Sequence, residues 1–462
     1  MRLSYLQESG INRVIFPLKT SILKFGCFFF TMENSNQIYN AYLDSSCVSI
    51  DSRSIKKGAI FFALRGPNFD GNQFANDALK KGAAYVVVDD PNCIEIKGNV
   101  FLVEDSLTAL QNLALHHRKQ LEIPIIGITG SNGKTTTKEL IHEVLSQKFL
   151  VHSTHGNMNN HIGVPITILQ ISKNYEVAII EMGANHLKEI EKLCSIACPN
   201  WGYVTNFGKA HLEGFGSEEG VISGKSELYE YLGKKNGKIL VNRDDLIQVE
   251  KTRKYMRSLF GSKSDCDIIV DYFESKNGLS LGYKKHIFKS PIHGNYNLTN
   301  IAAAISFGIL FEVDTYKIQK AISSYDSKNN RSEKIIIKKT PFILDAYNAN
   351  PTSMGVALDS FCNKYSKHNL VILGDMLELG KQTFTEHENI LNKCLKLGIT
   401  KIFTIGSNFI STKVNNEKIE KFVNIEQFID SFAKSKVHFE SVLIKGSRSM
   451  KLEKLIPFFK SL

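Results

Sequence analysis

The sequence predicts an α/β fold in which a small α/β unit precedes two larger, mostly parallel sheets. Short apolar runs bounded by polar turns alternate with amphipathic segments along most of the 462 residues. Such alternation is typical of parallel strands joined by crossover helices. A glycine-rich loop between an apolar run and a helical pattern supports the same class. At roughly 100–200 residues per domain, the length fits two to four domains.

We predict three domains after an amino-terminal extension. They comprise residues 32–121, 122–329 and 330–462, and each repeats the pattern of apolar runs and helical segments. In the first domain an amphipathic stretch at 72–81 separates two runs, and in the second a helical pattern covers 138–145. The predicted strands lie in the apolar runs 58–64, 84–88, 124–129, 176–182, 201–205, 238–242, 342–345, 370–373, 401–405 and 442–444.

Residues 1–31 do not fit this pattern. The apolar stretch 22–30 is far shorter than the ~20 residues that a membrane helix needs. The residues after it lack the small side chains of a signal-peptide cleavage site. We therefore expect no membrane insertion. Residues 1–31 are predicted to be a disordered extension or a mis-assigned start, with Met32 as the first translated residue.

The formal net charge of +11 has two interpretations. It could attract an anionic substrate such as a nucleotide or a nucleic acid, or it could be lysine spread over the surface. No dense Lys/Arg block occurs, so we favour the second interpretation and expect no nucleic-acid partner. Cys194 and Cys198 have no second Cys or His pair at zinc-site spacing. Free thiols are typical of a reducing compartment, so we expect a cytoplasmic protein.

The loop that follows the apolar run 124–129 has the sequence context of a phosphate-binding loop. Its glycines allow backbone N–H groups to surround phosphate oxygens, and the helix that follows directs its positive dipole end at them. Lys134 could reach the outer phosphates and the Thr135 hydroxyl could bind Mg²⁺. Ile128 occupies the first glycine position of the strict motif, so a generic kinase or GTPase loop is poorly matched, and a plain glycine-rich turn is the alternative. The predicted nucleotide-binding residues are Thr129, Gly130, Ser131, Asn132, Gly133, Lys134, Thr135 and Thr136.

This variant loop, Thr-Gly-Ser-Asn-Gly-Lys-Thr-Thr, resembles the ATP loop of the Mur ligases and of their relative folylpolyglutamate synthase. The resemblance extends over about residues 45–455. The segments typical of the branch that adds D-alanyl-D-alanine are 345–351, 373–380 and 445–450, whereas the Asp-Asn-Pro-Arg motif of the diaminopimelate-adding branch does not occur. Further segments that follow in the family's order are 156–165, 181–184, 205–213 and 294–303.

The resemblance implies a small UDP-binding domain, a central P-loop ATPase domain and a Rossmann-like carboxyl-terminal domain. It implies ATP-dependent joining of D-alanyl-D-alanine to UDP-N-acetylmuramoyl-tripeptide through an acyl phosphate, in peptidoglycan precursor synthesis by a monomer. Three rivals stay open: a sibling ligase that adds one amino acid or folylpolyglutamate synthase, an ATP-driven switch, and an inactive scaffold. The third residue of the peptide, diaminopimelate or lysine, also stays open.

Two Mg²⁺ ions are implied by the same resemblance. Thr135 and Glu181, which ends an apolar run, would hold the first ion. His211 and a carbamylated Lys225 would hold the second, and Lys134, His211 and Lys225 would act in catalysis. On its own pattern, Glu181 could be an exposed strand-end carboxylate, His211 a capping or packing residue, and Lys225 a solvated lysine on a helix.

The remaining candidates also come from the family's motifs. Tyr296 stands where the family usually has a histidine on the adenine side, so a packing role would survive there and an imidazole hydrogen bond would not. Loop residues of these types usually face water, which is the alternative for most of them. The implied nucleotide contacts are Asn297, Asn300, Arg331 and Asp345, and the implied substrate contacts are Ser52, Arg53, Asn159, Asn348, Asn350 and Arg448.

Overall fold

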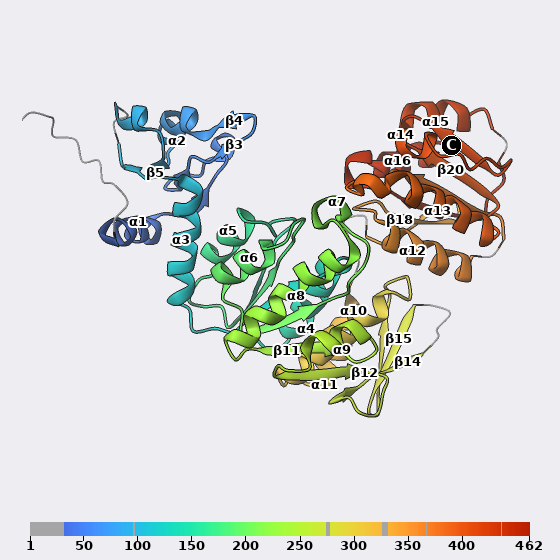
Figure 1. Cartoon of the computed structure of the whole chain (residues 1–462), viewed down its shortest axis with the longest axis horizontal. Helices are drawn as coiled ribbons and strands as arrows, with labels where there is room; N and C mark the ends of the chain where they lie inside the picture. The colour runs from blue at the N-terminus through green and yellow to red at the C-terminus, as the bar shows by residue number, and fades with distance from the viewer. Residues whose placement is uncertain (1–31, 96–97, 274–277, 326–330, 366, 436) are drawn as a thin grey trace, which may run out of the picture.

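The computed structural model describes residues 32–462 except 96–97, 274–277, 326–330, 366 and 436, so the prediction for residues 1–31 lies outside the described residues. The chain forms three lobes (Figure 1). The first lobe, in blue, and the last lobe, in orange and red, lie apart from each other, and the central green and yellow lobe adjoins both. The domain boundaries predicted above stay predictions.

The first lobe is built on a four-stranded parallel sheet in the order β1-β2-β5-β6. The runs 58–64 and 84–88 supply β2 and β5, whose apolar side chains are buried on both faces. Helix α3 begins at an Asp105 cap and packs against α5 and α6 of the central lobe. The strands are β1 Val48–Ser49, β2 Ile60–Phe62, β3 Arg65–Gly66, β4 Phe69–Asp70, β5 Tyr85–Val88 and β6 Val100–Leu102, the α-helices are α1 Met32–Asp44, α2 Ala75–Lys80 and α3 Ser106–Lys119, and the 3-10 helices are Ser52–Ser54, Gly71–Phe74 and Pro91–Glu95.

The central lobe contains a seven-stranded parallel sheet in the order β13-β12-β11-β10-β7-β9-β8. The chain places β8 and β9 on one side of β7 and β10 to β13 on the other. In open α/β sheets, ligands bind at the carboxyl ends of strands at such a switch point. The strands are β7 Ile125–Thr129, β8 Val151–Ser153, β9 Val177–Glu181, β10 Trp201–Val204, β11 Lys238–Asn242, β12 Arg257–Gly261 and β13 Ile268–Ile269.

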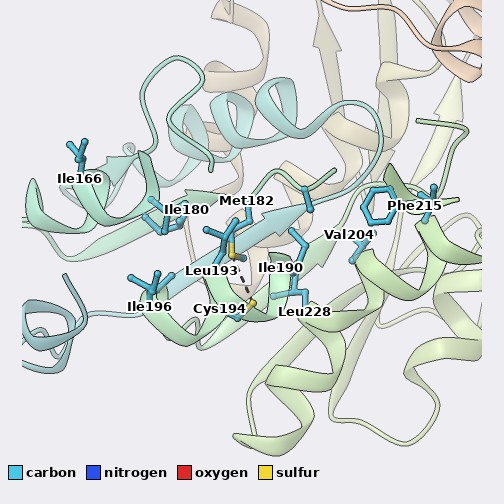
Figure 2. Close-up of a cluster of buried hydrophobic side chains, with 14 of the residues drawn as sticks. Ile166, Ile180, Met182, Ile190, Leu193, Cys194, Ile196, Val204, Phe215 and Leu228 are labelled. Carbon is cyan, nitrogen blue, oxygen red and sulfur yellow. Dashed lines mark hydrogen bonds between the residues drawn. The ribbon is translucent and has the colours of Figure 1, made fainter. Parts of the chain in front are cut away.

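Helices cover both faces of this sheet. Figure 2 shows one face, where Ile180 and Met182 lie over Leu193 and Cys194 of α6, with Leu228 of α8 beside them. Burying each aliphatic side chain of this size contributes about 1.5–3 kcal/mol, so the sheet is a stable base for the loops at its carboxyl edge. The helices are α4 Lys134–Leu145, α5 Gly163–Leu169, α6 Glu189–Ala197, α7 Leu212–Phe215, α8 Glu218–Lys234, α9 Leu246–Thr252, α10 Asn297–Leu310 and α11 Thr315–Ser324.

A small antiparallel sheet, β14-β15-β16, follows the central sheet and was not predicted. Its strands are β14 Asp271–Phe273, β15 Leu279–Tyr283 and β16 His286–Ser290. The glycine Gly282 and the lysines at 284–285 interrupt the apolar pattern, so no run long enough to predict a strand is present.

The last lobe holds a six-stranded sheet in the order β17-β18-β22-β19-β20-β21, in which only the β17–β18 pair is antiparallel. The four predicted runs lie within the four inner strands, and the mixed α/β fold with mostly parallel sheets is confirmed. The strands are β17 Glu333–Ile337, β18 Thr340–Asp345, β19 Asn369–Gly374, β20 Lys401–Ile405, β21 Ile419–Phe422 and β22 Ser441–Lys445, the α-helices are α12 Pro351–Lys364, α13 Thr383–Lys396, α14 Ser407–Ile410, α15 Ile425–Phe432 and α16 Leu455–Ser461, and the 3-10 helices are Gly380–Gln382, Arg448–Met450 and Leu452–Lys454.

Within the described residues, none of the helices combines the length and the apolar character needed to cross a bilayer.

Candidate active site

The predicted phosphate loop lies between β7 and α4 and is held by the residues that follow β10. Ser131 N donates to Asn206 O at 3.0 Å, and the Asn206 side chain bonds both the N–H and the carbonyl of Asn132. Thr205 Oγ1 donates to the same Asn132 carbonyl at 2.5 Å. The backbone conformation of the loop is therefore fixed by the residues that follow β10.

Glycine is required at two positions of this loop. Gly130 has φ +138°, and a Cβ atom there would overlap Thr205. Gly133 has φ +80°, and a Cβ atom would lie 2.7 Å from Asn300 Oδ1. Side chains rarely adopt such φ values, and no space is available for them here. Gly130 and Gly133 are therefore required both because their φ angles are positive and because no space is left for a Cβ atom.

Lys134 folds back over the loop. Its Nζ donates to Gly130 O at 2.7 Å and lies 3.4 Å from Ser131 O. Burial lowers the pKa of Lys134, and Glu181 partly offsets that effect. The ammonium thus lies over the centre of the loop, where the outer phosphates of a nucleotide would lie in a loop of this kind.

Glu181 ends β9 beside the loop and is almost completely buried. Its Oε1 accepts from Thr135 Oγ1 at 3.2 Å and from Asn159 Nδ2 at 2.8 Å. Its Oε2 lies 4.0 Å from Lys138 Nζ and has no hydrogen-bond partner among the described residues. A buried carboxylate oxygen without a partner is costly, and a cation would satisfy it. These oxygen donors fit Mg²⁺, which prefers hard oxygen ligands.

Lys225, on α8, is completely buried. Its Nζ donates to Ala184 O at 3.0 Å and lies 4.9 Å from the centre of the Phe215 ring. In the described part of the chain no ion pair joins this Nζ to a carboxylate. Burial, with Lys134 as the second cause, lowers the pKa of Lys225 well below its usual value. An unmodified ammonium would not fit a metal site, whereas a neutral amine could be converted into a ligand.

His211 lies on the loop after β10, at the start of α7, in the left-handed conformation with φ +53°. Its Nδ1 is 2.5 Å from Glu378 Oε2 of the last lobe. The close contact with His211 lowers the pKa of Glu378, although His211 Nδ1 has no aligned hydrogen-bond partner among the described residues. Nearby, Lys209 Nζ lies 3.1 Å from Glu386 Oε1 of α13, and Lys209 N donates to Thr352 Oγ1 of α12. Helix α7 contacts the 3-10 helix Gly380–Gln382 of the last lobe, and Figure 1 shows α7 on the side of the central lobe that faces the last lobe.

At the carboxyl edge of the last sheet, β18 and β22 place Asp345 opposite Lys445. Asp345 Oδ2 and Lys445 Nζ are 2.6 Å apart, and Asp345 Oδ1 accepts from Ser332 N. Lys445, which was not predicted as a site residue, therefore fixes the carboxylate. The two residues lie 100 positions apart in the sequence, so no local signal could have identified Lys445 as the partner of Asp345.

An aromatic ring brings two of the predicted arginines together. The Arg331 guanidinium lies 3.5 Å from the centre of the Tyr347 ring, and that of Arg448 lies 6.0 Å from it. Arg448 also pairs with Glu453 at 3.0 Å. Asn348 is exposed on the same loop and bonds the N–H of Ala349. These residues form a polar group around Tyr347.

The side chains behind the phosphate loop come from α10. Asn300 Oδ1 accepts from Thr137 Oγ1 at 3.1 Å, and Asn300 Nδ2 donates to Asn297 Oδ1 at 2.8 Å. Tyr296 Oη is 2.5 Å from Ser332 Oγ at the start of the last lobe. Tyr296, at the sequence position where the family usually has a histidine, thus connects the central lobe to the last lobe.

Asn350 caps helix α12, and its sequence context could have indicated this role. It caps α12, accepting from Ser353 N at 2.8 Å, while Ser353 Oγ accepts from Asn350 N. Its Nδ2 donates to Asn132 Oδ1 of the phosphate loop at 2.8 Å. The run Asn350-Pro351-Thr352-Ser353 has the cap, the first-turn proline and the N3 hydroxyl of a helix start.

Ser52 and Arg53 lie in the first lobe, after β1, and among the described residues no hydrogen bond or ion pair joins them to the groups above. Arg53 pairs with Asp51 at 2.8 Å and is strongly exposed. Ser52 O accepts from Lys81 Nζ at 2.7 Å. Their placement fits a separate binding region, while Asn159 lies beside Glu181.

Models of the Mur ligase family match most of the chain: the catalytic domain over residues 45–128, the middle domain over 128–308 and the glutamate ligase domain over 330–448. The chain belongs to the Mur ligase family. A curated relative from Bacillus subtilis (strain 168), named UDP-N-acetylmuramoyl-tripeptide--D-alanyl-D-alanine ligase, is 34% identical over 422 residues, which are 88% of this chain and 92% of the relative.

Two solved structures resemble the fold over almost its whole length. A crystal structure of MurF from Acinetobacter baumannii has a TM-score of 0.83 and 26% identity, and covers 93% of this chain and 98% of its own. The MurF ligase from Thermotoga maritima in complex with ADP has a TM-score of 0.80 and 26% identity, with 91% and 98% covered.

Proposed function

We propose that this chain is an ATP-dependent ligase that joins D-alanyl-D-alanine to UDP-N-acetylmuramoyl-tripeptide, giving the UDP-linked pentapeptide, ADP and phosphate. One observation carries the proposal: the phosphate loop and Glu181 lie at the carboxyl edge of the central sheet, and Asn350 and Glu378 of the last lobe contact that edge directly. The names of the curated relatives and of the two solved structures support this reaction over that of a single-amino-acid ligase.

The reaction consists of two displacements. A carboxylate oxygen of the tripeptide attacks the γ-phosphorus of ATP, and the bond to the bridging oxygen breaks to release ADP. The amine of D-alanyl-D-alanine then attacks the acyl carbon, loses a proton and displaces inorganic phosphate. Both steps concentrate negative charge, so cations positioned in advance lower the barrier. Lys134 is the cation of the phosphate loop that would do this.

We further propose that two Mg²⁺ ions bind here, because Thr135 and Glu181 offer oxygen donors and His211 a ring nitrogen. Bound Mg²⁺ would neutralise charge on the transferring phosphoryl group. Lys225 would complete the second set as a carbamate: CO₂ adds to the neutral amine, one N–H proton leaves, and an anionic group with two oxygens results. The low pKa of Lys225 supports this modification.

The substrate contacts are assigned by position. Ser52 and Arg53 would bind the uridine end on the first lobe. Asn348 and Arg448 would bind the dipeptide on the last lobe, because Arg448 can pair with its carboxylate. The free thiols of Cys194 and Cys198 fit a cytoplasmic location.

The reaction assay tests the proposal directly. With ATP, Mg²⁺ and UDP-N-acetylmuramoyl-tripeptide, the purified protein should release phosphate only after D-alanyl-D-alanine is added, because the acyl phosphate needs an amine to turn over. A coupled phosphate assay across tripeptides ending in diaminopimelate or lysine measures this and identifies the third residue. Turnover with free diaminopimelate or lysine and the dipeptide precursor, and none with D-alanyl-D-alanine, would overturn the proposal.

Domain closure is a second expected result. The proposed contacts for uridine lie on the first lobe and those for the dipeptide on the last, so the reacting groups meet only when the lobes close around them. Small-angle scattering should therefore record a smaller radius of gyration when an ATP analogue and the UDP-tripeptide bind together. Either ligand alone is the control. An unchanged radius with both bound would contradict closure.

A further inference from the structure

Two neighbouring strands of the last lobe each begin directly after a residue that can bind a metal. His368 precedes β19, and Glu440 precedes β22. The two strands pair in parallel with Asn369 opposite Ser441, so the residues in front of them lie side by side at the amino edge of the sheet. Glu440 N donates to His368 O at 2.8 Å, which fixes the two backbones to each other. The register of the sheet therefore holds an imidazole and a carboxylate together, although they are far apart in the sequence.

His438 joins them through the burial pattern of the segment that leads into β22. Val437 and Phe439 are half-buried against the core of the last lobe, whereas His438 and Glu440 are exposed. Such alternation is typical of an extended segment, whose side chains point to two opposite faces in turn. The Phe439 ring packs edge-on against Phe342, which anchors the inner face. His438 and Glu440 therefore share the outer face.

The three side chains converge on one another. The centres of the His368 and His438 rings are 5.0 Å apart, and His438 Nε2 lies 3.9 Å from Glu440 Oε1. One ligand atom of each residue, a ring nitrogen or a carboxylate oxygen, lies within 4.8 Å of the other two. In the described part of the chain, this is the only group of three His, Cys, Asp or Glu side chains with that property.

The donor set is that of a zinc site. Three-ligand zinc sites combine imidazole nitrogens with a carboxylate oxygen and leave a fourth position for water. Ligand atoms around a tetrahedral ion with bonds of about 2.1 Å are about 3.4 Å apart, so the side chains need to approach one another by roughly 1 Å. All three are exposed, and rotation about their χ angles supplies that movement. Mg²⁺ prefers oxygen ligands, so this group and the candidate active site select different ions.

We propose that His368, His438 and Glu440 bind one divalent transition-metal ion of the Zn²⁺ class, which links the segment before β22 to the residue before β19. The group lies at the amino edge of the last sheet. Asp345 and Lys445 lie at the carboxyl edge, about 17 Å away along strands of this length. The proposal is therefore independent of the function proposed above.

An ordinary surface ion pair is the competing explanation. In that case His438 and Glu440 attract each other, and His368 has no part in the interaction. The chain contains a matched pair of this kind. His186 Nδ1 lies 3.3 Å from Glu189 Oε1, both side chains are exposed, and among the described residues no third ligand joins them. His368→Ala therefore separates the two explanations, and His186→Ala is the control.

The first measurement is a calorimetric titration of the full chain with Zn²⁺, in excess Mg²⁺ and without nucleotide. His368→Ala and His438→Ala should each bind one ion fewer per chain than the wild type, and Glu440→Gln should bind that ion more weakly. Loss of an outer partner of a ligand already costs roughly 10–100-fold in affinity, so loss of a ligand should cost at least as much. The metal-free variants should melt at the wild-type temperature, because the positions are exposed.

Two outcomes of the titration would overturn the proposal. One is equal Zn²⁺ binding by the wild type and His368→Ala, which would leave only an ion pair. The other is a loss of the same size in His186→Ala, which would show that any exposed His–Glu pair binds the ion.

The second measurement identifies the donor atoms, because the cysteines of the described residues are free and thiolates also bind Zn²⁺. X-ray absorption of the complex with one equivalent of Zn²⁺ should show nitrogen and oxygen ligands at about 2.0–2.1 Å. A sulfur shell at about 2.3 Å would assign the ion to cysteine and contradict the proposal.

Amide hydrogen exchange tests the link between the two segments. The Glu440 N–H bonds His368 O, so its exchange should become slower when Zn²⁺ binds, because opening of this bond would then require release of the ion. His438→Ala should show no such change. An unchanged exchange rate in the zinc-bound wild type would contradict the link.

Discussion

Replacing Lys225 with alanine is expected to lower the rate of phosphate release roughly 10²–10³-fold, the usual cost of removing one preorganised group that stabilises transition-state charge. The proposed carbamate would be lost with the amine, and the second metal set would keep only His211. The steady-state rate in the coupled phosphate assay measures the effect. A small carboxylate such as acetate should restore part of the rate, because it can supply the missing oxygens in the space that the side chain leaves.

Two controls accompany this prediction. Lys225→Arg should be inactive and should not respond to acetate, because guanidinium stays charged and cannot form the carbamate. Lys234→Ala changes an exposed lysine at the end of the same helix and should behave as the wild type. Near-normal turnover of Lys225→Ala in bicarbonate-free buffer would contradict the assignment.

Lys134→Ala should have an effect of similar size on turnover, roughly 10²–10³-fold, because the loop would lose its one side-chain cation over the transferring phosphoryl group. The loop itself should keep its shape, since Thr205 and Asn206 hold the Asn132 backbone without help from Lys134. Turnover, together with binding of a fluorescent ATP analogue, measures the change. The melting temperature should stay close to that of the wild type.

The control for Lys134 is Lys148→Ala, which removes a lysine just beyond the same helix. Lys148 donates to the backbone carbonyls of Phe311 and Glu312 just after α10, pairs with the Glu312 carboxylate and lies over the Phe149 ring. Its loss should leave turnover unchanged. A Lys134→Ala protein with wild-type turnover would show that the ammonium does not act on the phosphates, and a large fall in melting temperature would assign it a structural role.

Features that depend on one short stretch of sequence could be predicted. The strand–loop–helix unit around Lys134 is contained in one short segment, whose apolar run, glycines and helical periodicity are all visible in sequence. The position of Glu181 also followed, because a carboxylate that ends a buried strand must lie at the edge of the sheet. The antiparallel strands β14 to β16 were not predicted, because their short alternating segments lack a continuous apolar run.

Contacts between segments that are far apart in the sequence could not be predicted in this way. Glu378 reaches His211, and Lys445 reaches Asp345, only because distant segments meet at sheet edges. No spacing rule links such residues, since their proximity depends on strand order and on how the lobes dock. The cap formed by Asn350 was predictable from its neighbours, whereas its bond to Asn132 was not.

The complete burial of Lys225 has a consequence for the time over which its chemical state can change. No part of the side chain is open to solvent, and the Phe215 ring lies against the amine. Entry and exit of CO₂ should therefore depend on local openings of the surrounding structure, which are rarer than side-chain motions. A carbamate formed there would therefore outlast many catalytic cycles. The fraction of carbamylated protein would then reflect the bicarbonate concentration during preparation.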